Sequence, residues 1–370
     1  MIDAGPDEIA AFRLARHGLD ARRPLPLAAV LACPASDFQR GSVLLALGAR
    51  AEGVTREGYD RAVDDGSLVI APSLRAAIHA VAPADVAVYG RALVAADDTE
   101  LGEQLGAPAA RQLKAAGVTP SAALEEVARA TAQAVSARGA LTKDELHDEL
   151  RGRVQGTLLP WCEGCASHHV APMLWRYGCV VAGARLDAQR RYVAGEAAAG
   201  TGAAQPHEAA RRFLRFYGPA TQKDFVAWAG VARAHGRRLW EAVAGELVEV
   251  RVDGRRLWLL EADADALASP PEPRGVRLLP PRDPYLQHPD RASVVPDPAL
   301  RKRVHRPVSS PGAVLQDGQV AGLWRVRARG KRAEIAIETV GIALDREALA
   351  AEADRVAALR GAASASVVVS

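Results

Sequence analysis

The spacing of apolar residues along the chain predicts short helices, many of them followed by paired strands. Residues 7–19 have the period of an amphipathic helix, with apolar positions at Ile9, Phe12, Leu14 and Leu19. Two further helices are indicated over Ser42–Glu52 and over the stretch from Thr55 to Asp65, where Gly66 ends the pattern. Strand-forming residues follow at 67–73 and 74–81. Helix, helix and hairpin in this order is typical of a winged-helix module.

The same order returns twice further along the chain. Thr142 and Glu145 form a capping box that opens a helix; a second helix is predicted near 167–177, and two strand-like stretches follow at 179–183 and 190–193. The third copy has a short helix from Thr221 that ends at Gly230, a helix over 232–245, and a hairpin whose turn is Asp253-Gly254. Its two strands are Leu247–Val252 and Arg255–Leu260.

A group of prolines between residues 270 and 284 marks a boundary, after which the pattern predicts mostly strands. Residues 275–342 are β-rich, a helix is expected over Asp345–Leu359, and the tail 361–370 is expected to fray. The sequence therefore predicts an α+β chain of tandem winged-helix modules with a C-terminal β-rich domain. The expected parts are 1–118 (module 1 with a helical connector, at 97–118), 119–200 (module 2), 205–265 (module 3) and 274–360 (β-rich domain with its helix).

Composition narrows the class of protein. With 370 residues and 49% hydrophobic residues, the chain is long enough for several globular modules. No apolar run reaches the roughly 18 residues of a membrane span, and the acidic start of the chain does not suggest a secretory signal. Four cysteines are too few for a disulfide framework. These features predict a cytoplasmic protein, and the Ala- and Arg-rich composition is typical of a bacterium with GC-rich DNA. We further expect the protein to be a nucleoid-associated monomer.

Charge is concentrated near the C-terminal end. Between Arg274 and Arg332 there are 13 Lys and Arg residues against 4 Asp and Glu, a local net charge of +9. The densest clusters are Arg301–Arg306 and Arg325–Arg332. Such a one-sided block indicates a polyanionic partner, although a solvated surface is the simpler alternative. We expect the partner to be double-stranded DNA.

Five blocks of the sequence, in order, resemble the AlkZ/YcaQ-type bacterial DNA glycosylases. They are Ala46–Arg56, Leu74–Asp85, Tyr217–Trp228, Leu278–Arg291 and Gly318–Arg325. The resemblance implies excision of N7-alkylated purines, including interstrand crosslinks, without a cofactor. The family's catalytic motif is Gln-apolar-Gln or Gln-apolar-Asp, about a dozen residues before the first block.

The motif's positions fall on Ala35, Ser36 and Asp37, so only Asp37 keeps a functional group. The resemblance implies a catalytic role for Asp37, while its place before a helix equally permits a capping role. Among other candidates, His79 either faces the DNA or is a satisfied core histidine. Asp283 either supports catalysis or forms a turn and an ion pair with Arg291. Glu52 is more simply a surface charge. The loss of the first Gln leaves open an attenuated glycosylase or a non-catalytic DNA-binding protein, such as a damage sensor or regulator.

Basic residues in the matched blocks and the third module are expected to contact DNA, mostly at its phosphates. They are Arg50, Arg75, Arg233, His235, Arg237, Arg238, Arg291, Arg325, Arg327 and Lys331. A separate cluster has the composition of a zinc site, namely Cys162, Cys165, His168 and His169. Its spacing is poor because adjacent histidines rarely bind one ion, so we expect no metal there and prefer a helix entry.

Overall fold

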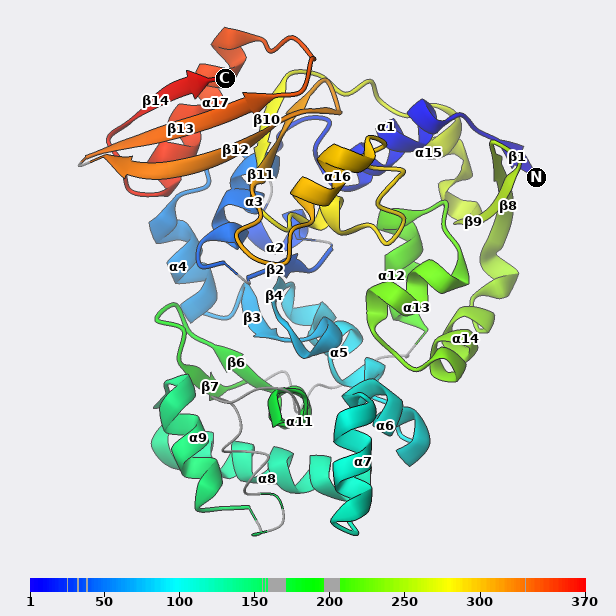
Figure 1. The fold of residues 1–370 in the computed structure, drawn as a ribbon, viewed down its shortest axis with the longest axis vertical. Helices are drawn as coiled ribbons and strands as arrows, with labels where there is room; N and C mark the ends of the chain where they lie inside the picture. Colours follow the sequence, from blue (N-terminus) through cyan, green and yellow to red (C-terminus); the bar gives the residue numbers. More distant parts are fainter. Residues whose placement is uncertain are drawn as a thin grey trace. The chain divides into compact units, whose positions relative to one another are not determined.

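The computed structural model describes residues 1–24, 26–31, 33–37, 39–154, 156, 158, 171–195, 207–329 and 331–370. It confirms a mixed α+β chain, drawn in Figure 1. Internal contacts divide the chain into two compact units. Unit 1 contains Met1–Ala62, Arg211–Asp224 and Gly245–Ser370, and unit 2 contains Val63–Ala210 and Phe225–Ala244. In the described residues, no helix is both long and apolar enough to span a bilayer.

A five-stranded sheet organises the C-terminal part of unit 1. Its strand order is β10-β11-β12-β13-β14 (Figure 1). The first four strands are antiparallel, and β14 lies parallel to β13. The strands are β10 (Val276–Leu279), β11 (Gly312–Gln316), β12 (Gln319–Arg329), β13 (Arg332–Thr339) and β14 (Ser364–Val369).

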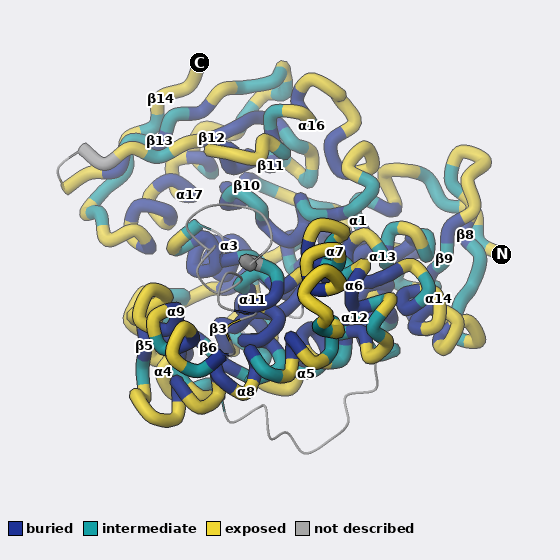
Figure 2. Tube along the Cα trace, turned by 60° about the horizontal axis from the view of Figure 1, so that its bottom comes forward, coloured by how far each residue is buried: buried dark blue, intermediate teal, exposed yellow. Residues whose placement is uncertain are grey.

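Helices cover both faces of this sheet. On one face, α3 (Ser42–Arg50) and α17 (Arg346–Leu359) pack on Val314, Trp324 and Ile335. Every residue of α3 is buried, as its dark course in Figure 2 shows. The other face is covered by α1 (Pro6–Arg16), α16 (Pro298–Val304) and the turn at Pro284–Gln287. That layer buries Leu14, Leu286, Leu300 and Leu323. Residues from both ends of the chain therefore share one core.

The predicted Asp-Gly hairpin is present in unit 1. Strand β8 (Leu247–Val252) pairs with β9 (Arg255–Leu260), and Asp253 and Gly254 take positive φ values of 48° and 75°. These are the values that a tight hairpin turn requires. The N-terminal strand β1 (Ile2–Asp3) adds to β8 in parallel, and α1 packs its apolar side on the hairpin. The smaller elements in or entering this unit are α2 (Leu27–Val30), β2 (Ala35–Ser36), α4 (Arg56–Asp64), α12 (Glu208–Tyr217), α13 (Gln222–Ala229) and α15 (Ala264–Ala268).

Unit 2 is built from helices and a sheet in which β4, β3, β6, β7 and β5 follow one another. Strand β3 (Val69–Pro72) pairs with β4 (Ile78–Val81) on one side and with β6 (Ala184–Leu186) on the other. The long helix α8 (Pro120–Arg138) packs against α11 (Ala171–Ala182). The other named elements are α5 (Val86–Tyr89), α6 (Asp98–Leu105), α7 (Ala107–Ala115), β5 (Ala140–Leu141), α9 (Lys143–Arg151), β7 (Tyr192–Ala194) and α14 (Arg233–Glu241).

Several sequence predictions are confirmed and others are wrong. The capping box at Thr142 is present, and the connector at 97–118 is helical. The strand predicted at 179–183 is wrong, because those apolar residues form the end of α11 and the turn after it. The frayed tail is also wrong, since residues 364–369 form β14. The helix over Asp345–Leu359 is confirmed, with Asp345 capping it through the N–H groups of Glu347 and Ala348.

One glycine in the sheet allows a close crossing that any side chain would block. A Cβ on Gly312 would lie 2.2 Å from Nε1 of Trp324 and 2.5 Å from the carbonyl oxygen of Leu279. The Trp324 ring crosses β11 at this point and donates a hydrogen bond of 2.8 Å to that carbonyl. Gly312 is therefore required for the Trp324 contact.

We expect Gly312→Ala to lower the free energy of unfolding by about 1–3 kcal/mol, because the added methyl overpacks the crossing. Denaturant unfolding measures this change. Gly245→Ala is the matched control, since a Cβ at Gly245 would have nothing within 4 Å. Equal stability of the two variants would contradict the role given to Gly312.

Candidate active site and nucleic-acid surface

A buried ion pair joins α3 to the turn that follows β10. Nη1 and Nη2 of Arg50 donate to the two carboxylate oxygens of Asp283 at 2.8 and 2.7 Å. The two side chains are 3% and 0% exposed. Arg50 also donates to the carbonyl oxygens of His17 (2.7 Å) and Ala46 (3.0 Å). The Asp283 carboxylate raises the pKa of Arg50 despite its burial, so the guanidinium stays charged.

This pair corrects two expectations from the sequence. Arg50 is buried against Asp283 and two carbonyl oxygens, so its guanidinium is not accessible to a DNA phosphate. The ion-pair partner of Asp283 is Arg50 rather than Arg291, and Arg291 is exposed. The predicted turn role of Asp283 is confirmed, because Oδ1 also accepts from the backbone N–H of Tyr285 at 3.0 Å.

A chain of hydrogen bonds runs from this turn to the segment that carries Asp37. The hydroxyl of Tyr217 donates to the carbonyl of Pro284 at 2.8 Å, and Sγ of Cys33 donates to the same hydroxyl at 3.3 Å. Burial raises the pKa of the Cys33 thiol to about 12, so the sulfur keeps the proton that it donates. Cys33 lies four residues before Asp37. The buried cluster thus anchors the start of the segment in which Asp37 lies.

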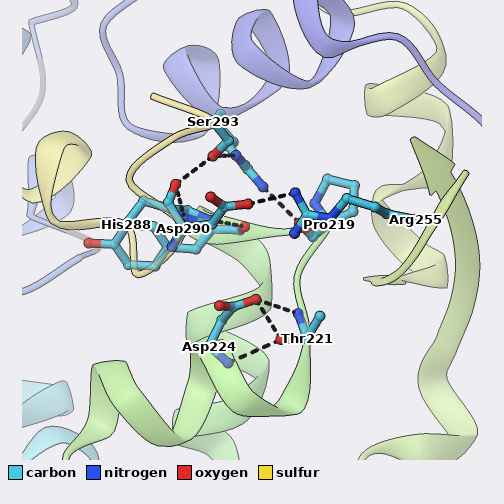
Figure 3. A network of polar contacts seen from close by, with 9 residues as sticks. Pro219, Thr221, Asp224, Arg255, His288, Asp290 and Ser293 are labelled. Atoms are coloured by element: carbon cyan, nitrogen blue, oxygen red, sulfur yellow. Dashed lines mark hydrogen bonds and ion pairs between the residues drawn. The ribbon is translucent and has the colours of Figure 1, made fainter. Parts of the chain in front are cut away.

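Arg13 and His288 hold the end of α12 and the residues that follow it through backbone carbonyls. Arg13 donates to the carbonyls of Gly218 (3.2 Å) and Pro219 (2.7 Å) and to Oγ of Ser293 (2.8 Å). Burial lowers the pKa of Arg13 to about 10, which still leaves it charged at neutral pH. Figure 3 shows the neighbouring contacts, in which Asp290 pairs with Arg255 at 3.0 Å.

His288 is a neutral ring with a defined tautomer. Nδ1 accepts from the backbone N–H of Asp290 at 2.9 Å, so the proton lies on Nε2. Nε2 then donates to the carbonyl of Tyr217 at 3.0 Å. Burial lowers the pKa of His288 to about 3, which keeps the ring neutral at physiological pH. His288 therefore serves as a fixed connector in this network.

Asp37 is a buried carboxylate, with only 2% of the residue exposed. It directly follows β2. The capping alternative for Asp37 is wrong, because α3 begins at Ser42 with Gly41 at its N-cap position and has no side-chain cap. Because it is buried and caps no helix, Asp37 remains the candidate functional group of this segment.

His79 lies on β4 in unit 2 and is 4% exposed. Its Nδ1 lies 3.0 Å from both Oγ of Ser73 and the carbonyl oxygen of Ala77. Burial, helped by the charge of Arg75, lowers the pKa of His79 to about 4, so the ring is neutral at pH 7. These contacts favour the core-histidine alternative, and a catalytic role for His79 stays a prediction. Glu52 is exposed, as expected of a surface charge.

The remaining predicted DNA contacts differ in how much of their charge is available. His235 is 8% exposed and burial lowers its pKa, which disfavours a charged phosphate contact. Arg238 is exposed but forms a two-fold ion pair with Glu100 at 2.6 and 2.7 Å, and Arg237 lies 4.0 Å from Glu241. Arg75 donates to the carbonyl of Trp228.

Four of the predicted contacts are exposed and have no ion pair with any residue that the structure describes. They are Arg233, Arg291, Arg327 and Lys331. Arg325 is exposed as well and donates to the carbonyl of Ser309 at 2.8 Å. Of the residues predicted to contact DNA, these five provide most of the positive charge that is accessible to a phosphate.

The metal candidates Cys162, Cys165, His168 and His169 lie outside the described residues. Within the part of the chain that the structure describes, no group of three or more His, Cys, Asp or Glu side chains is placed to hold a metal ion.

Sequence reasoning missed Arg13, His17, Tyr217 and His288 as members of one buried network. A signal was present in α1, where Ile9, Arg13 and His17 are spaced by four and so share one helix face. An arginine and a histidine on the apolar face of a helix indicate buried polar contacts. Their partners on other segments could not be inferred without the fold.

We expect Asp283→Asn to lower the free energy of unfolding by about 3–5 kcal/mol, because it leaves the buried Arg50 charge without its partner. Thermal or denaturant unfolding measures the loss. Glu272→Gln is the control, since its ion pair with Arg274 is 75% and 81% exposed and should contribute little. Similar effects of both substitutions would contradict a structural role for the Arg50–Asp283 pair.

Comparison with known proteins places the chain in a family. Residues 29–359 match the family model described as DNA glycosylase AlkZ-like. A stretch of 132 residues is 35% identical to the interstrand DNA cross-link repair glycosylase of Streptomyces sahachiroi; it covers 33% of this chain and 35%, about a third, of that relative. The solved structure of the Streptomyces sahachiroi DNA glycosylase AlkZ matches over 100% of both chains with a TM-score of 0.79 and 23% identity, which shows the fold. The chain belongs to the AlkZ-like DNA glycosylase family.

Proposed function

We propose that this protein is a DNA-repair glycosylase that hydrolyses the N-glycosidic bond of bulky or crosslinked N7-alkylated purines in duplex DNA. The observation that carries the proposal is Asp37, a buried carboxylate at the position of the family's catalytic motif. The Cys33–Tyr217–Pro284 hydrogen bonds support it, because they fix the segment before Asp37. Double-stranded DNA is the proposed partner, and the proposed working form is a monomer.

The chemistry requires little more than one well-placed negative group. An N7-alkylated purine is cationic and leaves readily, and the sugar develops oxocarbenium character as the bond breaks. In the proposed mechanism the Asp37 carboxylate stabilises this positive charge and orients the attacking water. The leaving purine carries away the bonding electron pair, which neutralises its charge. Water adds to the sugar and gives up one proton, so the products are an abasic site and the free base.

We infer that excision is slower than in relatives that keep the first Gln of the motif. Ala35 stands at that position and offers no polar side chain to the water or the sugar. One preorganised hydrogen-bonding group of this kind contributes roughly 3–4 kcal/mol to transition-state stabilisation. A cationic leaving group offsets part of that loss because the bond to it is already weak.

We further propose that DNA is held by three winged-helix modules, at 1–118, 119–200 and 205–265, and by the β-rich domain at 274–360. The order of elements supports this division. Helices α3 and α4 precede the β3–β4 pair, α9 and α11 precede β6–β7, and α13 and α14 precede β8–β9. Each proposed module thus has, along the chain, the helix–helix–hairpin order typical of a winged helix.

The exposed basic residues support a binding mode dominated by phosphates. Arg233, Arg291, Arg327 and Lys331 present exposed cationic side chains, which suit contacts with phosphates rather than with base edges. Recognition in this proposal therefore depends on the charge and shape of the lesion, and little on the surrounding sequence.

We expect Asp37→Asn to abolish excision while leaving DNA affinity within about twofold, because phosphate contacts elsewhere set the affinity. The substrate is a duplex with a single N7-methylguanine, scored for abasic sites, with binding measured separately by fluorescence anisotropy. Asp263→Asn is the matched control, since Asp263 is a buried carboxylate of the same unit that pairs with Arg16.

Retained excision by the Asp37→Asn variant would remove Asp37 from the mechanism. If the wild-type protein excises no N7-alkylated base from any duplex, the family fold serves a non-catalytic DNA-binding role here, as a damage sensor or regulator.

We also expect affinity for undamaged duplex DNA to fall with salt at a log–log slope of about −5, which corresponds to roughly six phosphate contacts. Titrations at several salt concentrations measure the slope. A flat response, or tight binding to one short sequence alone, would contradict a phosphate-dominated surface.

A further inference from the structure

A hollow of about 220 Å³ lies on the C-terminal sheet of unit 1, beside the end of α16. Its charged lining consists of Arg303 and Arg306 from the end of α16, Arg325 on β12 and Glu338 on β13. Ala336 on β13 and Val368 on β14 line it as well. The predicted DNA contacts include only Arg325 of this group, so the Arg301–Arg306 cluster has no role yet. We refer to this feature as the Ala336 hollow.

The hollow exists because a small residue lies between larger ones where the helical cover ends. Arg325, Ala336 and Val368 are direct neighbours across β12, β13 and β14, so their side chains share one face of the sheet. Leu323, two residues before Arg325 on the same face, is buried in the layer that includes α16. Beyond it the face is open, and the methyl group of Ala336 leaves a depression between Arg325 and Val368.

The charge of the hollow is positive but small. Arg303 forms an ion pair with Glu338, so these two charges cancel. Nη2 of Arg325 donates to the carbonyl of Ser309, which fixes the side chain and leaves its charge uncompensated. The guanidinium of Arg306 is exposed and forms no hydrogen bond or ion pair within the described residues. Two cations at the rim match one or two carboxylates better than a long track of phosphates.

Two exposed apolar side chains lie at or beside the hollow. Only four large hydrophobic residues of the described chain are exposed, namely Met1, Val308, Val368 and Val369. Val368 lines the hollow at 52% exposure. Val308, at 75%, directly precedes Ser309, whose carbonyl accepts from Arg325, whereas Val369 lies on the other face of the sheet. Clustered exposed apolar residues beside charged ones are typical of a protein interaction site.

The sheet also offers an unpaired edge at this place. β14 is the last strand in the sheet order and, among the described residues, pairs with β13 alone (Figure 1). An edge strand can accept an extended segment of another protein through main-chain hydrogen bonds. The uncompensated arginines, the exposed apolar side chains and the unpaired edge of β14 therefore lie together at the Ala336 hollow.

We propose that the Ala336 hollow is a docking site for an extended acidic segment of a partner protein. The segment places one apolar side chain over Ala336, against Val368, and sets neighbouring carboxylates against Arg306 and Arg325. A DNA backbone would satisfy the arginines but offers no apolar group to cover Val308 and Val368. The site thus serves to recruit the enzyme or to connect it with another protein, independently of the excision chemistry.

The test uses the full-length protein and four fluorescein-labelled peptides, Asp-Asp-X-Asp-Glu with X as Val, Ile, Leu or Phe, and a fifth with X as Ser. Fluorescence anisotropy measures binding. We expect at least one apolar peptide to bind more than about tenfold tighter than the Ser peptide, a difference of 1.4 kcal/mol. Two substitutions should each weaken the binding of that peptide by about tenfold or more. They are Ala336→Leu, which fills the hollow without changing its charge, and Arg306→Glu.

Two controls separate this site from a phosphate contact. Arg274→Glu makes the same charge change at another exposed arginine of the unit and should leave peptide binding within about twofold. Ala336→Leu should leave affinity for duplex DNA unchanged, because it removes no charge. The proposal is overturned if no apolar peptide binds better than the Ser peptide. It is equally overturned if Ala336→Leu binds the peptide normally while Arg306→Glu weakens both peptide and DNA, since the arginines would then contact phosphate.

Discussion

The buried pair between Arg50 and Asp283 is the interaction on which the candidate site depends. Arg50 lies at the end of an entirely buried helix, and Asp283 opens the turn after β10. Removing two charges from water costs several kcal/mol per ion, and only complete hydrogen bonding offsets it. Here the arginine has Asp283 and two backbone carbonyls as acceptors, and the carboxylate also caps its own turn. Such a pair tolerates little displacement of either segment.

The position of the proposed catalytic carboxylate follows from this constraint. Asp283 sets the turn that presents the Pro284 carbonyl, which accepts from Tyr217, whose hydroxyl in turn accepts from Cys33. Each link is buried, so each is shielded from competition with water and is stronger than it would be at the surface. The segment of Asp37 is thereby tied to the C-terminal part of the unit, although more than 200 residues separate them in the sequence. A carboxylate held in this way can be preorganised for a developing positive charge.

Features encoded by neighbouring residues were predictable from the sequence, and those made by distant residues were not. The Asp253-Gly254 turn and the Thr142 capping box each need only a few adjacent residues, and both were found. The apolar run at 179–183 was assigned to a strand because a buried helix end and a buried strand have the same short pattern. Strand β14 could not be predicted in this way, because it pairs with β13 only after the chain has passed through the helix α17. Likewise, the family motif located Asp37, but only the fold excluded its capping role.

Arginine shows most clearly why a charge count is a weak guide to function. Arg13 and Arg50 are 4% and 3% exposed and serve as internal hydrogen-bond donors. Within the basic block, Arg303 is paired with Glu338, Arg274 with Glu272, and Arg301 donates to the carbonyls of Val295 and Pro296. The sequence alone gives all of these residues the same positive charge, whereas the structure leaves some residues of the block exposed and without an ion pair to any described residue, including the predicted DNA contacts Arg291, Arg327 and Lys331. Because an ion pair cancels most of the distant field of its arginine, DNA affinity should follow these unpaired residues rather than the total charge of the block.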